Sequence, residues 1–538
     1  MRGIAAVVAA GLAAGGAFAS PVLGTREIAA AVTEELTNEI RPGGVAQPGF
    51  WNENSTRFMY PPSLRFMEVP GAAKYRFSVV DARGTLVSIE SPDPVARLCP
   101  QWTNLVAGIV NVVCEAQDGK GVRVGLVQDR FFYKKAPFAG GYPPPARRAG
   151  EAAKAAYAHL AAMPQIRHLA EKGEPDRTYM LNGYTTKMNA AIVLAMVHYA
   201  KLDPARAPEA LKVARAAADH LIAGAAKPGT PLAGFTLTYE AGYGNGICDK
   251  YAGQSMNLYP AASGNAFLRL YGATKDAAYL AAAVRIGETY LRLQGEDGTW
   301  FLKQRFADGG EVNPNRLFPL TTMGFLEDLY VETKRAEFRA AADRAAAFIE
   351  RGPVADWNWE GQFEDVEPEP RYTNLTKHPA TDFALFCLKR HPGDAKRVAL
   401  AREILRFAED QFIEWERPFQ GCRLPPPVWG VYARDFWHDK RAPIEEAVYP
   451  AVLEQYRCYV PVDASSAKMI RTYLALYRAE GKALDLAKAR ALADALTRAQ
   501  RADGSIPTWM IPGRSPGDDW INCHIASANA LEELSDED

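Results

Sequence analysis

The spacing of hydrophobic and polar positions changes near residue 150. Between about residues 58 and 135, apolar residues alternate with polar ones in short runs such as "KYRFSVVD" and "GVRVGLVQ", and Gly, Pro or Asp separates the runs. Alternation of this kind is typical of β-strands with one buried face. After residue 150, apolar residues recur every three or four positions over longer, Ala-rich segments, as in amphipathic helices. The pattern predicts a small β-module followed by a large helical domain.

The predicted helices occur in pairs, with Asp, Pro or Gly at the joins. The pairs are 184–201 with 207–224, 253–271 with 276–293, 318–332 with 336–350, 381–391 with 394–415, and 465–480 with 484–500, and the segments 151–171, 443–457 and 520–534 complete other pairs. A spacing of roughly 50 to 70 residues per hairpin indicates a repeat architecture. We expect six or seven hairpins in a closed or nearly closed ring.

Two of the joining loops match in sequence. "LRLQGEDGTW" (291–300) and "TRAQRADGSIPTW" (497–509) both have Gln, two residues, Asp-Gly and then Trp. They resemble the "Q-x-x-D-G-x-W" turns of (α/α) toroids, the fold of many glycoside hydrolases, uronate lyases, epimerases and terpene cyclases. In this interpretation the Asp-Gly turn reverses the chain, while Trp300 and Trp509 cover helix ends. The resemblance implies a mainly α protein with an (α/α)6-7 toroid, but a fold does not decide chemistry.

Composition breaks suggest the domain boundaries. The first 19 residues contain Arg2, a short apolar run and Ala-Phe-Ala, and predict a signal peptide and therefore export to the periplasm or the extracellular space. An N-terminal segment (20–57) precedes a module (58–135) in which "LRFMEVPGAAKYRFSVVD" resembles the opening strands of a fibronectin III-like β-sandwich. A Pro- and Gly-rich linker (136–150) then leads to the toroid (151–538).

Charge and cysteine content exclude several classes of partner. The net charge of −1 gives no electrostatic case for binding nucleic acid or an anionic membrane. No segment after the signal has the length of apolar sequence needed for membrane insertion. The seven cysteines show no CxxC spacing, which argues against a thiolate zinc site. We expect no required cofactor and no catalytic metal, and a structural Ca²⁺ or Zn²⁺ ion stays open.

The loops between the predicted helices concentrate Tyr, Trp, Asn, Arg and acidic residues. Aromatic faces stack on sugar rings, whereas amide and guanidinium groups bind hydroxyls and carboxylates, so the mixture predicts a carbohydrate cleft. The candidate substrate-binding residues are Arg316, Asn313, Asn374, Arg434, Trp300, Trp359, Tyr243 and Asn182. In "NPNR", Pro314 holds a short loop on which Asn315 and Arg316 could converge on a carboxylate, although Asn313 could equally cap a helix.

Five of the eight histidines fall in or at the ends of predicted helices. His378, His438 and His524 are left for chemistry, and Tyr432, Tyr449 and Tyr456 compete as an acid. The candidate catalytic residues are His378, Tyr432, Tyr449 and Asn315. His378 follows Asn374 on a segment interrupted by Pro379, where we expect a cleft loop before a helix. A hydrogen-bonded, partly buried histidine is the alternative.

Two reactions fit these loops. β-Elimination in a uronate polysaccharide needs donors that neutralise the carboxylate, a base for the C5 proton and an acid for the leaving oxygen. Hydrolysis needs two carboxylates, and the loops supply Glu360, Glu364, Asp365, Asp382, Glu445, Glu446 and Asp519. A non-catalytic glycan-binding protein is a third interpretation. The balance of residue types favours the lyase, with an acidic polysaccharide as its substrate.

Residues 150–538 resemble the (α/α)-barrel polysaccharide lyases, and among them polysaccharide lyase family 38, the alginate and glucuronan lyases. The resemblance rests on architecture and residue order. It implies that Asn315, His378, Tyr432 and either Arg316 or Arg434 form the site. The fibronectin-like module is a departure from that family.

Overall fold

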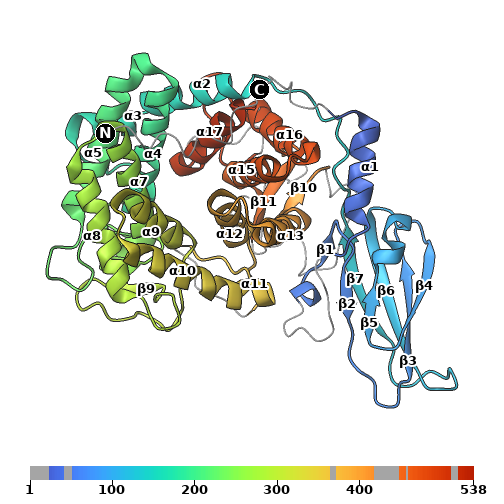
Figure 1. Cartoon of the computed structure of the whole chain (residues 1–538). Helices are drawn as coiled ribbons and strands as arrows, with labels where there is room; N and C mark the ends of the chain where they lie inside the picture. Colours follow the sequence, from blue (N-terminus) through green and yellow to red (C-terminus); the bar gives the residue numbers. More distant parts are fainter. Residues whose placement is uncertain are drawn as a thin grey trace.

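The computed structural model describes residues 23–40, 51–363, 371–416, 447–455, 458–510 and 519–537. In this part of the chain, six antiparallel helix pairs form a ring, with one helix of each pair inside and the other outside (Figure 1). The inner helices are α4 (Thr185–Leu202), α7 (Tyr259–Thr274), α9 (Leu320–Thr333), α12 (Lys377–Arg390), α15 (Asp463–Glu480) and α17 (Ile521–Ser535). Their outer partners are α5 (Ala207–Gly224), α8 (Ala277–Leu293), α10 (Ala336–Arg351), α13 (Ala395–Phe412), α16 (Ala483–Ala499) and α2 (Ala149–Ala162).

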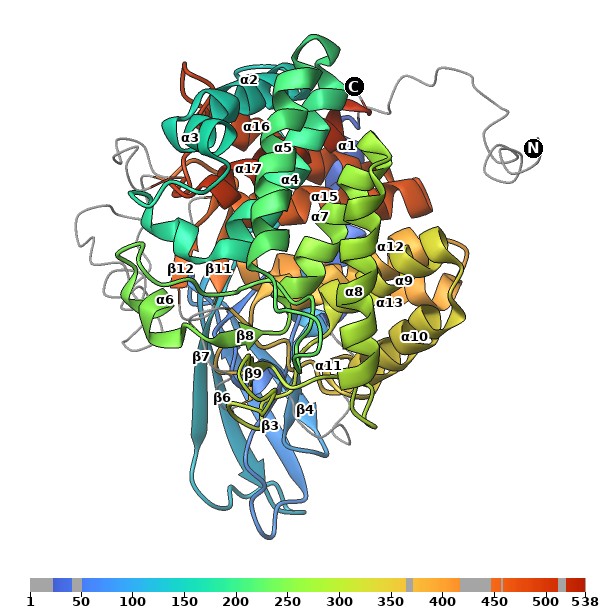
Figure 2. The same ribbon diagram turned by 90° about the vertical axis from the view of Figure 1, so that its left-hand side faces the viewer.

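The ring is closed by its first and last helices. Each inner helix packs against the next, and α17 contacts both α4 and α2. The helical part is therefore an (α/α)6 toroid, as the recurrence of helix pairs predicts. Shorter helices α3 (Pro164–Lys172), α6 (Gly246–Tyr251) and α11 (Pro353–Asp356) lie in the connections, as Figure 2 shows for α3 and α6.

Residue size decides which helices lie inside. Outer helix α5 buries one stripe of mostly small residues from Ala210 to Leu221, which is the pattern of a helix with one face in the core. Inner helices need close contacts on several sides. A Cβ on Gly264 of α7 would lie 2.3 Å from the ring of Phe325 on α9, so glycine is needed for this helix approach.

The two matching loops adopt the same hydrogen-bonded turn. The Gln294 side chain donates to the carbonyls of Gly298 (2.8 Å) and Ala341 (2.9 Å). The Gln500 side chain donates likewise to Gly504 and Ala152, both at 2.9 Å. Because Ala341 and Ala152 belong to the next outer helix, each glutamine fastens its turn to the neighbouring hairpin.

We predict that Gly504→Ala destabilises the protein by about 1–3 kcal/mol, because it adds backbone strain and a steric clash. Gly504 has a φ of +91°, and a Cβ there would lie 2.4 Å from the Ala155 carbonyl oxygen. Denaturant unfolding measures the change. Gly393→Ala is the control, since its Cβ would meet no atom within 4 Å. Equal stability of the two variants would contradict the structural role of the turn.

The β region contains two sheets beside the ring (Figure 1). A five-stranded sheet has the order β1-β7-β6-β3-β4, antiparallel except between β1 and β7, and β2 pairs with β5. The strands are β1 (Arg57–Phe58), β2 (Ser63–Arg65), β3 (Lys74–Val80), β4 (Leu86–Ser91), β5 (Val95–Arg97), β6 (Gly108–Gln117) and β7 (Gln128–Lys134). Trp102 stacks on Phe132 in its core. The specific likeness to fibronectin III stays a prediction.

A buried ionic network joins the β region to the ring. Asp410 on α13 accepts hydrogen bonds from the backbone N–H groups of Met59 (2.6 Å) and Tyr60 (2.7 Å). The Lys488 ammonium group lies 2.9 Å from Glu409 and 2.7 Å from Glu35, which belongs to α1 (Thr25–Leu36). The ring, the sheets and α1 therefore share one buried interface.

The structure corrects three local predictions. The segment 443–457 was predicted to be helical, but its described part contains strand β11 (Ala451–Gln455), which pairs with β10 (Ile413–Glu414) and β12 (Cys458–Pro461). The segment 151–171 forms two helices, because Pro164 starts α3. His378 lies in the first turn of α12 rather than on the preceding loop.

Candidate functional site

The loops that precede the inner helices are connected to one another at one end of the ring. The Gln362 side chain donates to the Arg316 carbonyl (2.8 Å), and the Gly361 N–H donates to the Asn374 carbonyl (3.0 Å). Thr376 forms a β-bridge with Gln455, and the Asp463 N–H donates to Thr508 (3.0 Å). Strands β8 (Gln254–Met256) and β9 (Lys303–Arg305) continue the same layer. This end of the ring is therefore a continuous surface built from loops.

Helix α12 and strand β11 meet in this layer. The Thr376 hydroxyl accepts a hydrogen bond from the His378 N–H (3.2 Å), which caps α12. The buried Lys377 ammonium group donates to the backbone carbonyl (2.6 Å) and the carboxylate (3.0 Å) of Glu454 on β11. These bonds fix β11 against the start of α12.

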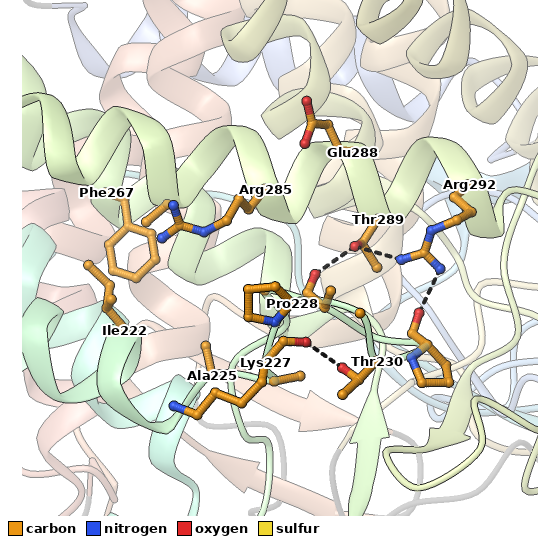
Figure 3. A pocket seen from close by; sticks show the side chains of 16 residues that line it. Ile222, Ala225, Lys227, Pro228, Thr230, Phe267, Arg285, Glu288, Thr289 and Arg292 are labelled. Atoms are coloured by element: carbon orange, nitrogen blue, oxygen red, sulfur yellow. Dashed lines mark hydrogen bonds between the residues drawn. The ribbon is translucent and has the colours of Figure 1, made fainter.

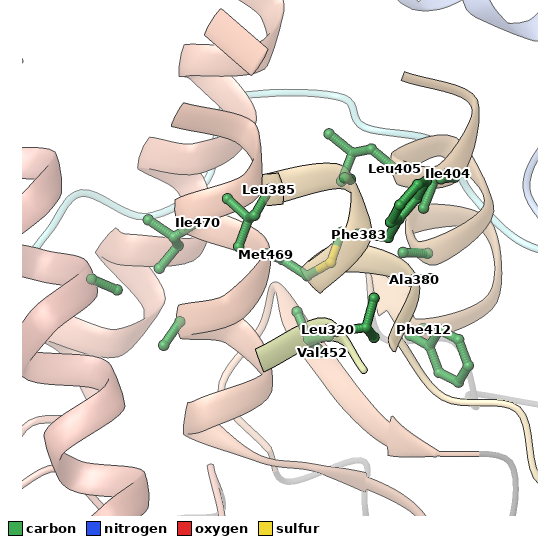
Figure 4. Close-up of a cluster of buried hydrophobic side chains, with 14 of the residues drawn as sticks. Leu320, Ala380, Phe383, Leu385, Ile404, Leu405, Phe412, Val452, Met469 and Ile470 are labelled. Carbon is green, nitrogen blue, oxygen red and sulfur yellow. The ribbon is translucent and has the colours of Figure 1, made fainter. Parts of the chain in front are cut away.

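A hydrophobic cluster beneath the layer supports this junction. Phe383 of α12, Met469 and Ile470 of α15 and Val452 of β11 are buried there, and Figure 4 shows Met469 extending from α15 toward α12. Side chains in such a close-packed core keep fixed rotamers. This core is therefore a rigid support for Lys377 and Glu454 at the junction.

His378 and Glu454 form the accessible pair of the site. His378 Nε2 lies 3.4 Å from Glu454 Oε1, and the two side chains are 24% and 20% exposed, whereas Lys377 is fully buried. Burial lowers the pKa of His378 below its usual 6.5, and Lys377 adds to this effect against the opposing influence of Glu454. The imidazole is therefore neutral at pH 7 and can accept a proton.

Glu454 is held in the ionised form. Burial alone would raise its pKa, but the Lys377 ammonium group, His378 and the Ser465 hydroxyl together hold that pKa well below its usual range. The Ser465 hydroxyl donates to Glu454 Oε2 at 2.5 Å. A fixed carboxylate beside a neutral imidazole orients the ring and stabilises the imidazolium that forms when the ring takes a proton.

A second carboxyl group lies deeper, at the start of α15. Asp463 is fully buried and accepts a hydrogen bond from the Ser527 hydroxyl (2.8 Å). Burial raises its pKa well above the usual range, in spite of the bond from Ser527, and Glu454 raises it further. Burial therefore favours the protonated form of Asp463.

Aromatic and cationic side chains stand beside this pair. The half-buried ring of Phe363 lies edge-on to His378, with 5.9 Å between centroids. The half-buried Lys187, in the first turn of α4, has its ammonium group 5.9 Å from the Trp520 ring. Both Lys187 and Lys377 act electrostatically on the buried Cys523 thiol, whose pKa is raised by burial and by Asp463 and Glu454. Lys187 therefore lies close enough to Cys523 to act on the same buried thiol as Glu454.

Most of the other predicted site residues have structural partners. Arg316 binds Asp297 through two bonds of 2.9 and 2.6 Å and lies over the Phe301 ring. Asn313 accepts the Asn315 N–H (3.1 Å), which stabilises the "NPNR" turn. The Asn182 side chain donates a hydrogen bond to the Asp176 carbonyl, and the Trp300 indole N–H donates one to the Tyr290 carbonyl. The Tyr243 ring packs against the Arg177 guanidinium group. Their roles in binding stay predictions.

Five further predicted residues are placed elsewhere or lie outside the described part of the chain. Trp359 is fully buried against Phe383, and the buried Asn374 amide has no hydrogen-bond partner among the described residues. Tyr449 lies just before β11, joined to Pro450 by a cis peptide bond. Tyr432 and Arg434 lie outside the described residues.

His524, another predicted candidate, is buried between two backbone groups. Its Nδ1 accepts the Ile506 N–H (3.1 Å), and its Nε2 lies 2.9 Å from the Ala156 carbonyl. Burial lowers its pKa to about 4, so the ring is neutral and structural. The residues 417–446, which contain His438, are not described.

The described residues contain no group of three His, Cys, Asp or Glu side chains arranged to hold a metal ion. Within the same residues, no helix combines the length and apolar content needed to cross a membrane. The expectations about cofactors and export stay predictions.

No family model and no curated protein matches this sequence. Among solved structures, the chain is similar to a family 76 glycoside hydrolase from a bovine Bacteroides thetaiotaomicron strain, with a TM-score of 0.45, 12% identity and coverage of 89% of this chain and 96% of that chain. It is also similar to cellobiose 2-epimerase from Spirochaeta thermophila (TM-score 0.47, 15% identity, 68% and 88% covered). A third similar structure is an unsaturated glucuronyl hydrolase specific for heparin, with a TM-score of 0.44, 11% identity and coverage of 72% of this chain and 97% of that chain. All three neighbours are named as carbohydrate-processing enzymes, and at these scores none of them assigns chemistry to this site.

Proposed function

We propose that the protein cleaves a uronic-acid-containing polysaccharide by β-elimination, with His378 as the base. One observation carries the proposal: a neutral, partly exposed imidazole beside an ionised carboxylate, on a loop surface that also holds a lysine and half-buried aromatic rings. Abstraction of the weakly acidic C5 proton needs a positioned base and a counter-charge for the substrate carboxylate.

The residues divide these tasks. His378 takes the C5 proton, and Glu454 positions the ring and stabilises the imidazolium. Lys187 binds the substrate carboxylate. Its positive charge stabilises the negative charge that develops on this carboxylate as C5 loses its proton. Phe363 and Trp520 offer apolar faces to the sugar rings. Tyr432 or Tyr449 remains our proposal for the acid that protonates the leaving oxygen.

The test is turnover of glucuronan, alginate and pectate by the purified protein. β-Elimination creates a C4–C5 double bond conjugated with the carboxylate, so the ultraviolet absorbance of the mixture should rise as chains are cut. Release of reducing ends without that absorbance, from acidic or neutral glycans, would contradict the lyase and favour a hydrolase.

Hydrolysis is the second candidate, because two carboxyl groups of opposite pKa shift lie near each other. The pKa of Glu454 is lowered and that of Asp463 is raised, which is the pattern of a base or nucleophile paired with a general acid. The full burial of Asp463 places it out of reach of a substrate, which is why elimination is the better-supported proposal. Asp463→Asn should leave a lyase active, whereas a hydrolase using this pair would lose nearly all activity.

The pH dependence should report His378. Because its pKa is lowered from 6.5, the deprotonated base is available at lower pH, and kcat/KM should rise with a midpoint below that value. Glu454→Gln removes the carboxylate that raises the His378 pKa, so the midpoint should move to still lower pH. An unchanged midpoint in Glu454→Gln would show that Glu454 does not act through His378.

A further inference from the structure

A groove of about 790 Å³ lies on the outer wall of the ring, away from His378 and Glu454 in the fold. It is formed by the end of α5, the loop that follows it and α8, and Figure 3 shows these elements with the lining side chains. Ile222, Ala226, Phe267 and Ala282 give it an apolar lining. This volume is within the usual range for small-molecule sites, roughly 300 to 1,000 Å³.

The charged lining is mainly positive. Lys227, Arg285 and Arg292 line the groove together with one acid, Glu288. The Glu288 carboxylate is already bound by Arg335 at 2.7 Å. An excess of cations around an apolar lining favours an anionic ligand with an apolar face.

Arg285 is the cation available to such a ligand. Arg292 donates to the Pro231 carbonyl (2.7 Å) and the Thr289 hydroxyl (3.0 Å), and Lys227 donates to the Ala223 carbonyl (2.9 Å). Arg285 is exposed, and its guanidinium group makes no hydrogen bond or ion pair with any described residue. In Figure 3 its side chain extends toward Phe267 and Ile222, at the opposite end from Arg292.

One loop connects the groove with the site. Its first part lines the groove through Ala233 and Gly234, and its later part bonds to the start of α4, where Leu237 accepts the Thr186 N–H (3.1 Å). The next residue of α4 is Lys187. The groove and the substrate-binding lysine thus lie at the two ends of the same ordered connection.

We propose that this groove is an accessory binding site for uronate oligosaccharides. Arg285 binds a sugar carboxylate through its planar guanidinium group, and the apolar lining accepts the C–H face of a pyranose ring. The anionic character follows from the groove itself, whereas the choice of a uronate rests on the proposed function.

Calorimetric titration of the full-length His378→Ala protein with a glucuronate hexasaccharide tests the site without turnover. Two binding events are expected, and adding Arg285→Ala should weaken one of them about tenfold, equivalent to roughly 1.4 kcal/mol. Arg269→Ala is the matched control: Arg269 is an exposed arginine on α7 outside the groove and should leave both events unchanged. Equal binding by the Arg285 and Arg269 variants would overturn the proposal.

A neutral glucose hexasaccharide separates charge from shape. If its binding also depends on Arg285 and is as tight as that of the uronate, carboxylate recognition is overturned. Turnover by the otherwise unmodified chain is measured independently. Uronate binding that depends on Arg285, without turnover, would contradict the proposed lyase activity and support the accessory site. Turnover with no effect of Arg285→Ala on binding would support the lyase activity and contradict the accessory site.

Discussion

Replacement of His378 by alanine is expected to lower the kcat of uronate cleavage by about 10²- to 10⁴-fold, the range for loss of a general base. The imidazole is held by its position in the first turn of α12 and by Glu454 at 3.4 Å, so the variant removes a base that is fixed in place. The initial rate of absorbance increase on the best substrate measures the effect. Substrate binding should change little, because Lys187 and the aromatic rings stay in place.

His391→Ala is the matched control for this variant. His391 ends the same helix at the opposite end, where its Nε2 lies 3.9 Å from Glu327. This variant should keep its kcat, and both variants should unfold at similar denaturant concentrations. A His378→Ala protein that is folded and retains full turnover would exclude His378 as the base and leave the chemistry to other residues.

The ring could be predicted from the sequence because its signals are local. Helical periodicity, paired segments and the two Gln-x-x-Asp-Gly turns each act within a few residues, and the structure shows the same bonds from Gln294 and Gln500. Strand β11 was missed because an Ala- and Leu-containing run next to helices fits either period. The segment forms a strand because Val452 pairs with Ile413 and Leu453 pairs with Pro461. Both partners lie outside the segment, so its own sequence does not show the pairing.

The candidate site could be predicted only in part. Elimination of helical histidines leaves His378 as a candidate, yet His378 itself lies in a helix, so the argument that retained it misplaced its element. Its catalytic role stays a prediction. Glu454 was missed since the segment was predicted as a helix. The pairing of Arg316 with Asp297, 19 residues away, could not be seen either, because the turn between them decides which side chains meet. The Pro-flanked run "AVLEQYRCYVP" was the available strand signal.

The second large effect is expected at Lys488, in the network between the ring and the β region. Lys488→Met should destabilise the protein by about 3–5 kcal/mol, because it leaves Glu409 charged and buried without its cation. Lys488 and Glu409 are both about 1–2% exposed and 2.9 Å apart. Urea unfolding measures the loss. Lys482→Met, which removes an exposed pair with Glu480, is the control and should cost no more than about 1 kcal/mol.

The double variant Lys488→Met/Glu409→Gln tests the reason for that loss. If the cost comes from an unpaired buried charge, neutralising Glu409 should recover part of the stability lost in Lys488→Met. The pH dependence gives a second check. Burial would lower the pKa of Lys488, but Glu35 and Glu409 outweigh this and raise it, so its contribution is complete below the unfolded value of about 10.4 and is lost as the pH rises through the folded pKa. Equal stability of Lys488→Met and Lys482→Met would mean that the apolar contacts alone hold the two parts together.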